Sequence, residues 1–324
     1  MSRVLITGAS GFVGSAVVDS LVINSGFAPR AALRRDSHSF PSFVDVVQVG
    51  HLAPDTDWCA TLKGVDAVVH AAARVHVMQD TASDPLTEFR RVNVEGTLTL
   101  ARQAAAAGVK RFVFISSIKV NGEGTPLGKP YSADDSPTPT DPYGVSKMEA
   151  EHGLRQLASE TGVEVVIIRP TLVYGPGVKA NFLSMMRWLD KGVPLPLGAI
   201  HNKRSLIALD NLVDLIVTCI DHPVAANQTF LAGDGEDLST TELLQRMAKA
   251  LGRQARLIPV PAKLLELGAT ILGKRAIALR LCGSLQVDIS KARDLLGWEP
   301  VVTVDEALRQ TAKAYVEDKG KWFN

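Results

Sequence analysis

Cysteine is scarce in this sequence, and its three copies are too far apart to suggest a shared site. Among 324 residues, Cys59, Cys219 and Cys282 show no CxxC or Cys/His spacing. A disulfide framework or a zinc site would require paired cysteines or histidines at a fixed spacing. We therefore expect three reduced thiols in the core, where free cysteine is commonly buried, and no metal site.

An excess of charge of one sign is absent as well. Lys and Arg total 35 while Asp and Glu total 34, which gives a formal net charge of +1. Nucleic acids and anionic membrane surfaces attract proteins with a strong positive excess. The composition therefore gives no reason to expect either partner.

No apolar run is long enough to cross a bilayer. The most apolar late stretch, residues 259–287, is interrupted by five charged residues, whereas a spanning helix needs about 20 nearly uncharged ones. The stretch predicts an amphipathic helical pair that packs on the protein or on a membrane surface, and packing on the protein is favoured. The first predicted strand begins at Arg3, which leaves no room for a signal peptide, so we expect a cytoplasmic protein.

Short apolar runs alternate with helical patterns through the first half of the chain. The predicted strands are residues 3–6, 30–33, 44–49, 67–70, 111–115 and 163–168. The predicted helices between them include residues 14–23, 86–107 and 146–161. This alternation is typical of a doubly wound α/β fold of the Rossmann type. The runs are apolar throughout, as in parallel strands covered on both faces.

The pattern changes after residue 172. Loop signals such as GPG at 175–177 follow, and the box STTE at 239–242 predicts the start of a helix. We expect residues 1–172 to form a nucleotide-binding Rossmann domain, to which the chain returns around 206–222. Residues 173–324 would form a smaller mixed α/β domain that binds substrate.

A glycine-rich motif, TGASGFVG at residues 7–14, joins the first predicted strand to the first helix. Glycines at such a turn let backbone N–H groups approach a pyrophosphate at the helix N-terminus. Because a strand precedes the motif and a helix follows it, we interpret it as a dinucleotide site. The residues expected to contact the cofactor are Gly8, Gly11, Phe12, Val13 and Gly14.

The end of the second strand bears on the choice between NAD and NADP. An acidic residue there would hold the ribose 2′-hydroxyl of NAD, but this chain has Arg34 followed by Arg35 and Asp36. An arginine favours the 2′-phosphate of NADP(H) through charge-assisted bonds. NAD(H) stays possible, because Asp36 could still reach a ribose.

The segment HAAA at residues 70–73 follows another predicted strand at its carboxyl end, where cofactors bind in open sheets. The small side chains of Ala71, Ala72 and Ala73 would let the backbone approach the cofactor. His70 has no acidic neighbour in sequence, so we interpret it as structural.

Two hydroxyls, a phenol and an ammonium form the candidate catalytic set. Ser116 and Ser117 end the predicted strand at 111–115, and Tyr143 and Lys147 lie one helical turn apart on one face of a helix. A nearby ammonium favours the phenolate. A tuned phenol can take a proton from a sugar hydroxyl or return it, while Ser117 orients the reacting oxygen.

These motifs together resemble the extended short-chain dehydrogenase/reductases, in particular the nucleotide-sugar epimerase/dehydratase family. The resemblance covers essentially the whole chain. It also includes NVEGT at 93–97, RP at 169–170, VYGPG at 173–177 and LGWEP at 296–300.

The resemblance implies a role for several residues. Ser117, Tyr143 and Lys147 would be the catalytic triad, and Lys147 would also bond the nicotinamide ribose. The residues on the cofactor side would include Ser116, Asn93 and Pro170, besides Tyr143 and Lys147. Asn181 and Arg204 would contact the diphosphate of a UDP-sugar, although Arg204 could also be an ordinary surface charge. Relatives commonly dimerise through two long helices, here 86–107 and 146–161, so we expect a homodimer.

Departures from the family pattern narrow the expected reaction. Dehydratases carry an acid pair directly after the catalytic Ser or Thr, where this chain has Ile118 and Lys119. The tyrosine usual downstream of the serine in UDP-glucose 4-epimerases is missing too. The segment SSIKVNGE at 116–123 is similar to bacterial reductases of UDP-4-keto-6-deoxy-N-acetylhexosamines in O-antigen assembly. Lys119 would either steer the substrate or cap a surface turn.

The leading hypothesis is therefore an NADPH-dependent reductase acting at C4 of such a UDP-4-keto sugar, giving UDP-N-acetylquinovosamine or its C4 epimer. The alternative is a UDP-hexose 4-epimerase with tightly bound NAD, acting on UDP-glucose or UDP-N-acetylglucosamine. A reductase of a non-sugar carbonyl, and a catalytically silent NADP(H)-binding regulator, are two further hypotheses.

Overall fold

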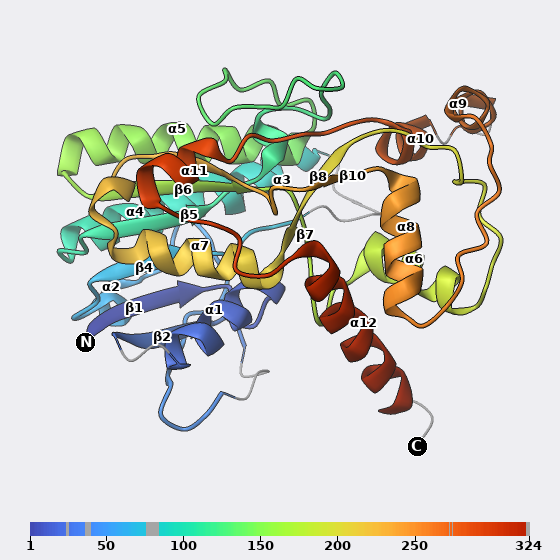
Figure 1. Cartoon of the computed structure of the whole chain (residues 1–324). Helices are drawn as coiled ribbons and strands as arrows, with labels where there is room; N and C mark the ends of the chain where they lie inside the picture. The colour runs from blue at the N-terminus through green and yellow to red at the C-terminus, as the bar shows by residue number, and fades with distance from the viewer. Residues whose placement is uncertain (24–25, 36–39, 76–83, 272, 274, 322–324) are drawn as a thin grey trace.

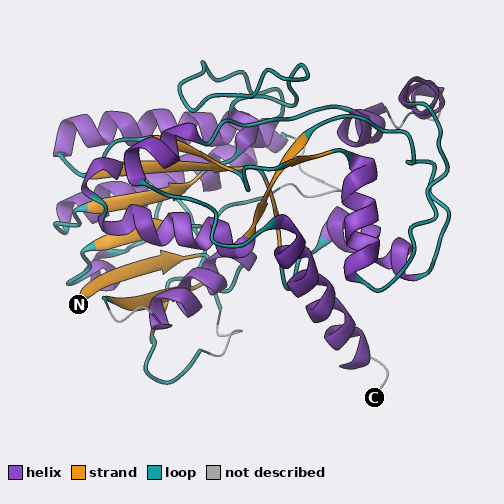
Figure 2. Cartoon of the chain, in the orientation of Figure 1, coloured by secondary structure: helices purple, strands orange, loops and turns teal. Residues whose placement is uncertain are grey.

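A computed structural model describes residues 1–23, 26–35, 40–75, 84–271, 273 and 275–321. Its larger part is a seven-stranded sheet in the order β3-β2-β1-β4-β5-β6-β9, with every neighbouring pair parallel (Figures 1 and 2). The strands are β1 (Ser2–Thr7), β2 (Phe27–Leu33), β3 (Asp45–Gln48), β4 (Ala67–His70), β5 (Arg111–Ile115), β6 (Glu164–Pro170) and β9 (Thr229–Ala232). This is the doubly wound Rossmann-type arrangement predicted from the sequence.

Helices cover both faces of this sheet, as Figure 1 shows. The helices of this part are α1 (Phe12–Ile23), α2 (Cys59–Leu62), α3 (Pro85–Phe89), α4 (Thr97–Ala106), α5 (Pro142–Thr161), α7 (Leu209–Asp221) and α11 (Ser290–Leu296). Two 3₁₀ turns, η2 (Ile118–Val120) and η3 (Pro223–Ala225), lie in its connections.

Successive residues of each central strand point to opposite cores. In β1, Val4 and Ile6 pack with α1 and α7, while Leu5 packs with α4 and α5. Phe112 and Val113 of β5 divide between the two cores in the same way. Because both faces are buried, these strands read as continuous apolar runs in the sequence.

The predicted helix over 86–107 is interrupted. Residues Pro85–Phe89 form α3 and Thr97–Ala106 form α4, but Arg90–Gly96 between them form a π-helical turn, η1. A π turn inserts an extra residue into the helical register and is frequent at functional sites. It carries Asn93, whose contacts are described below.

A second, smaller sheet lies beside the first, in the order β10-β8-β7. Its strands are β7 (Leu172–Tyr174), β8 (Arg204–Ala208) and β10 (Asp237–Leu238), with β7 and β8 parallel and β8 and β10 antiparallel. Around it lie α6 (Ala180–Asp190), α8 (Thr240–Ala250), α9 (Ala262–Ile271), α10 (Arg275–Cys282) and α12 (Val304–Lys321) (Figure 1). The predicted capping box is present, because the Ser239 hydroxyl and the Glu242 carboxylate close the start of α8 reciprocally.

The chain crosses between the two sheets more than once. We predicted a return to the Rossmann part around 206–222, and α7 does pack there beside α1. Residues 206–208 belong instead to β8 of the small sheet. The chain later adds β9 to the large sheet, a strand that the sequence analysis did not identify.

The cysteines are not all in the core, contrary to our expectation. Cys219 is buried and Cys282 is half-buried, but Cys59 is exposed at the start of α2, and all three are free thiols. Within the described ranges, no three potential metal ligands come together. No helix of the described part combines the length and apolar character that a membrane span requires.

Candidate active site

The glycine motif forms a tight turn between β1 and α1. Gly8 has a φ of +68°, and a Cβ there would lie 2.8 Å from the Ala72 nitrogen. A Cβ on Gly14 would lie 2.2 Å from the Gly8 carbonyl oxygen, which no side chain could tolerate. Both positions therefore require glycine, one for its backbone angle and both for close packing. The turn leaves the first residues of α1, Phe12 and Val13, beside the carboxyl end of β1, which fits the pyrophosphate cradle predicted from the sequence.

The other predicted cofactor residues lie at the same edge of the sheet. Ala71, Ala72 and Ala73 follow β4 as half-buried loop residues, and the Ala72 amide donates to the Thr7 hydroxyl at 3.3 Å. Arg34 is exposed directly after β2. Asp36, the residue that would favour NAD, lies outside the described residues.

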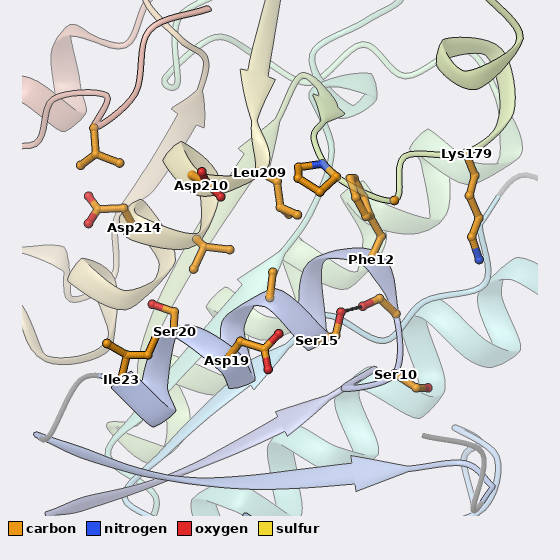
Figure 3. A pocket seen from close by; sticks show the side chains of 16 residues that line it. Ser10, Phe12, Ser15, Asp19, Ser20, Ile23, Lys179, Leu209, Asp210 and Asp214 are labelled. Carbon is orange, nitrogen blue, oxygen red and sulfur yellow. Dashed lines mark hydrogen bonds between the residues drawn. The ribbon is translucent and has the colours of Figure 1, made fainter. Parts of the chain in front are cut away.

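A cavity of about 1080 Å³ borders the same helix but lies away from the candidate catalytic groups. Figure 3 shows that it is lined by the side of α1 that faces α7, with Asp19, Asp210 and Asp214 around it and Lys179 at one end. The Ser15 hydroxyl donates to the Gly11 carbonyl oxygen at 2.8 Å here. Neither Ser117, Tyr143 nor Lys147 lines this cavity, so its size does not identify the reaction site.

Ser117 and Tyr143 are brought together at the carboxyl end of β5. Ser117 leads from β5 into η2, while Tyr143 lies in the first turn of α5. Burial raises the pKa of the Tyr143 phenol to about 12, the nearby Asp141 carboxylate adds to this rise, and the neighbouring Ser117 side chain opposes it.

Local sequence explains why α5 begins just before Tyr143. Asp141 is its N-cap, with Oδ1 accepting from the Gly144 amide at 2.6 Å, and Pro142 follows in the first helical position. The other carboxylate oxygen of Asp141 pairs with the Lys119 ammonium, which also lies 3.2 Å from Glu123. These ion pairs tie η2 to the start of α5, and a role of Lys119 in steering the substrate stays a prediction.

Lys147 lies one turn further along α5 and is buried, with 2% of its surface exposed. Its Nζ donates to the Ile115 carbonyl oxygen at 2.7 Å and lies 4.3 Å from the centre of the Phe114 ring. Burial lowers the pKa of this ammonium to about 7, and the Glu151 carboxylate opposes that fall. Within the described part of the chain no hydrogen bond joins Lys147 to Tyr143, so its expected tuning of the phenol would act through space.

His70 has a structural setting, in line with our interpretation. It is fully buried, with Nδ1 2.6 Å from the Thr7 hydroxyl and Nε2 2.9 Å from the Thr97 hydroxyl. Its ring stacks on Phe114. Burial lowers the pKa of His70 to about 3, and the nearby Lys147 charge lowers it further, so the ring is neutral near pH 7.

Ser116 is engaged in a buried network that the sequence analysis missed. Its hydroxyl donates to Glu151 Oε1 at 2.6 Å, and Arg169 donates to both oxygens of the same carboxylate at 2.9 and 2.6 Å. Arg169 also donates to Asn121 Oδ1 at 2.9 Å. The Ser116 hydroxyl is therefore engaged within the protein, and the placement of Ser116 on the cofactor side stays a prediction. Glu151 follows Lys147 by four residues on the same helix face, a spacing that could have revealed it.

Asn93 links three segments around the site. Its amide group donates to the Arg74 carbonyl oxygen and to the Ser146 hydroxyl, both at 3.0 Å, and its Oδ1 accepts from the Arg74 amide at 2.8 Å. The Ser146 hydroxyl donates in turn to the Tyr143 carbonyl oxygen at 2.8 Å. Asn93 thus fixes the loop after β4 against α5, which is consistent with its expected support of the cofactor side.

The expected substrate contacts lie on separate elements of the smaller part. Asn181 is exposed near the start of α6, and Arg204 is half-buried at the start of β8, where it donates to the Gly283 carbonyl oxygen at 3.0 Å. Burial lowers the pKa of Arg204, and the positive charge of Arg280 adds to this fall while Glu123 opposes it. Arg280, which we did not single out, therefore lies near enough for its charge to act on Arg204. Pro170 is buried at the end of β6.

Comparison with known proteins gives consistent findings. The model of the NAD dependent epimerase/dehydratase family matches residues 4–233. A UDP-glucose 4-epimerase of Vibrio cholerae is 51% identical over 315 residues, which cover 97% of this chain and 95% of that protein.

Solved structures show the same fold. UDP-glucuronic acid 4-epimerase from Bacillus cereus, in complex with NAD, gives a TM-score of 0.79 over 97% of this chain and 99% of that one, and at 21% identity the likeness is one of fold alone. MoeE5, in complex with UDP-glucose and NAD, is 26% identical with a TM-score of 0.77, covering 98% of this chain and 100% of that chain. On the family match and the close relative, this chain belongs to the NAD dependent epimerase/dehydratase family.

Proposed function

We propose that this protein transfers a hydride at C4 of a UDP-hexose, and that its net reaction interconverts the two C4 epimers. The observation that carries the proposal is the proximity of Ser117 and Tyr143 at the carboxyl end of β5, on the edge of the sheet that also carries the glycine turn. The 51% identity with a protein named UDP-glucose 4-epimerase supports the choice of reaction.

Tyr143 would exchange the proton of O4. In the oxidative half-reaction its phenolate takes that proton while the C4 hydride leaves. In the reductive half-reaction the phenol returns the proton to O4 of the 4-keto sugar. With a pKa of about 12, Tyr143 is a phenol at neutral pH in this structure and is ready for the second role. Ser117 would hold O4 in line with the phenol.

The glycine turn and Lys147 would hold the cofactor, and the bound nicotinamide accepts and returns the hydride. Lys147, with its ammonium fixed by Ile115 and Phe114, would contribute a positive charge and bond the ribose, supported by Asn93. We propose Arg204 and Arg280 as the diphosphate site, because an anion between two neighbouring guanidinium groups would relieve their repulsion. Asn181 would contact the same diphosphate.

A C4 reductase of a UDP-4-keto sugar is the second candidate, and one observation favours it. Arg34 is exposed directly after β2, the position from which an arginine could pair with the 2′-phosphate of NADP(H). An epimerase that returns every hydride to its own substrate would suit NAD(H), whereas a reductase that consumes cofactor would suit NADP(H). In Arg34→Ala, affinity for NADPH would fall with little change for NADH if the arginine holds the phosphate.

One pair of assays separates the candidates. Purified protein is incubated with UDP-glucose or UDP-N-acetylglucosamine without added cofactor, and the C4 epimer is followed by NMR. It is then mixed with NADPH or NADH and UDP-4-keto-6-deoxy-N-acetylglucosamine, and absorbance at 340 nm is followed. Epimer formation without added cofactor supports the first candidate, and stoichiometric loss of NADPH supports the second. Cofactor binding with neither activity would contradict both.

The roles of the two parts of the chain and its oligomeric state are also proposals. We propose that residues 1–172 with α7 and β9 bind the cofactor and that most of the remaining chain binds the sugar nucleotide. We further propose a homodimer through α4 and α5, which pack side by side with Leu98 directly over Gly153. Sedimentation velocity would show a monomer if this is wrong.

A further inference from the structure

A fully buried carboxylate lies close to the candidate catalytic groups, and the proposed reaction makes no use of it. Glu151 is on α5, one helical turn beyond Lys147, and none of its surface is exposed. Burial of a carboxylate is costly unless charged donors satisfy it. Both oxygens are satisfied here: Oε1 accepts from Ser116 and Arg169 at 2.6 and 2.9 Å, and Oε2 accepts from Arg169 and Arg155 at 2.6 and 3.1 Å.

This network holds both ends of the short segment that carries Ser117. Ser116, which donates to Glu151, directly precedes Ser117 at the end of β5. At the other end, Asn121 directly follows η2 and accepts from Arg169 at 2.9 Å. All four side chains of the network are buried. We call Ser116, Asn121, Glu151 and Arg169 the buried clamp.

The buried clamp also fixes this segment against the helix that carries Tyr143. Glu151 lies on α5 about two helical turns beyond Tyr143, and a helix transmits a fixed position along its length. A second connection between the same elements, the ion pair of Lys119 with Asp141, is partly exposed, with 26% and 20% of the two side chains accessible. Water and salt weaken such a pair, so the placement of η2 against α5 depends mainly on the buried clamp.

We propose that the buried clamp positions the Ser117 hydroxyl for proton transfer by Tyr143, a role that rests on the proposed function. Glu151 and Arg169 are then positioning residues, because they act on the reaction only through Ser117. Displacement of a reacting group by about 1 Å can lower a rate about a hundredfold. The carboxylate and the guanidinium together carry no net charge, so their effect on the site is one of geometry.

Removal of both charges tests the proposal without leaving one of them buried and unpaired. In Glu151→Met/Arg169→Met, long apolar side chains replace the ion pair, a change that is often neutral for stability. We expect kcat to fall by about tenfold to a hundredfold, while KM and the affinity for cofactor stay close to those of the unaltered protein. A loss of cofactor affinity as large as the loss of kcat would overturn the proposal.

The same double substitution in a Ser117→Ala background separates positioning from general damage. If the buried clamp acts through Ser117, its removal should lower kcat little further once that hydroxyl is gone. Fully additive losses would overturn the proposal. The matched control is Arg111→Met/Glu164→Met, which removes an ion pair between the opposite ends of β5 and β6 and should leave kcat unchanged.

Crystal structures of the unaltered protein and of Glu151→Met/Arg169→Met give a readout that needs no turnover. We expect the Ser117 hydroxyl to be displaced from the Tyr143 phenol by about 1 Å in the variant, and an unchanged spacing would overturn the proposal. Failure of the unaltered protein to perform either reaction would remove the proposed function alone, because the displacement of Ser117 would still be measured. If the double variant does not fold, Arg169→Lys decides, since lysine keeps the charge but lacks the forked bonds: an unchanged kcat and an unmoved Ser117 would then overturn the proposal.

Discussion

At the scale of single residues, burial sets the charge of the groups around the candidate site. Tyr143 and Lys147 face the same edge of the sheet, and burial shifts their pKa values in opposite directions, to about 12 and about 7. Burial disfavours the charged form of each, phenolate in one case and ammonium in the other. Tyr143 is therefore a neutral phenol near pH 7, whereas Lys147 is divided between ammonium and neutral amine.

Tyr143→Phe should remove this proton transfer and leave the fold unchanged. We expect turnover to fall by about a hundredfold to ten-thousandfold, while cofactor binding and the melting temperature stay close to those of the unaltered protein. Steady-state kinetics with fluorescence titration of the cofactor would check it. Tyr315→Phe, on α12 and bonded to Asp190, is the matched control. Substantial turnover in Tyr143→Phe would remove the phenol from the mechanism.

His70 should make the protein sensitive to acid. Its pKa is about 3 in the folded chain and about 6.5 when unfolded. Between these values the unfolded chain binds a proton that the folded chain does not, so stability falls as pH drops from about 6.5 toward 3, by at most about 1.4 kcal/mol per pH unit. Denaturant titrations across this range should show a shallower slope for His70→Gln. An unchanged slope would contradict the assignment, and His51→Gln, at an exposed histidine, serves as control.

At the scale of elements, the start of α5 is the point where fold and chemistry meet. Asp141 caps the helix and also places a negative charge near the Tyr143 phenol, while Lys119 pairs with that charge from η2. One carboxylate thus positions the phenol through its hydrogen bond to the helix and raises the phenol's pKa through its charge. The two effects can be separated, because an amide can cap a helix without carrying charge.

Two substitutions should move the pKa of Tyr143 in opposite directions. Asp141→Asn keeps a capping oxygen and removes the charge, so the pKa should fall. Lys119→Met leaves the Asp141 charge less compensated, so the pKa of Tyr143 should rise. We expect shifts of about half a unit to one unit. Ultraviolet titration of the phenol and the pH profile of turnover would measure them. Shifts of both variants in the same direction would show that the Lys119–Asp141 ion pair affects folding and not the pKa of Tyr143. Lys119→Arg keeps the positive charge and should restore the original pH profile of turnover.

At the scale of the whole molecule, the two sheets are built from interleaved segments. Residues 172–174 and 204–208 form strands of the small sheet, whereas α7 and β9 return to the large one. Later still, Trp298 packs into the core beneath α7 and donates from Nε1 to Asp214 at 2.9 Å. A single cut in the chain therefore leaves neither core complete.

A chain ending at residue 233 should consequently fail to fold cooperatively, although the family model matches almost the whole of that length. It would lose α8 and α12 from the core of the smaller part, and α11 with Trp298 from the larger one. We expect helical far-ultraviolet circular dichroism without a sharp thermal transition. A cooperative transition in the shortened chain would show that the larger part is stable alone.

The sequence by itself determined the features that depend on neighbouring residues. The predicted bounds of β4 and β5 agree with the structure, because continuous apolar runs flanked by turns report strands buried on both faces. The glycine turn and the four-residue spacing of Tyr143 and Lys147 are equally local. These local patterns were sufficient to predict the Rossmann-type sheet and to identify the family.

Only the tertiary structure decided which distant residues meet. The pairing of Glu151 with Arg169, the approach of Arg280 to Arg204, and the bond between Lys119 and Asp141 join segments far apart in sequence. Strands β7, β8, β9 and β10 were not predicted from the sequence, and each is held by pairing with a strand distant in the chain. Contacts between residues that are distant in the chain produce no periodic pattern in the sequence. The environment of each catalytic group therefore becomes known only when the chain is folded.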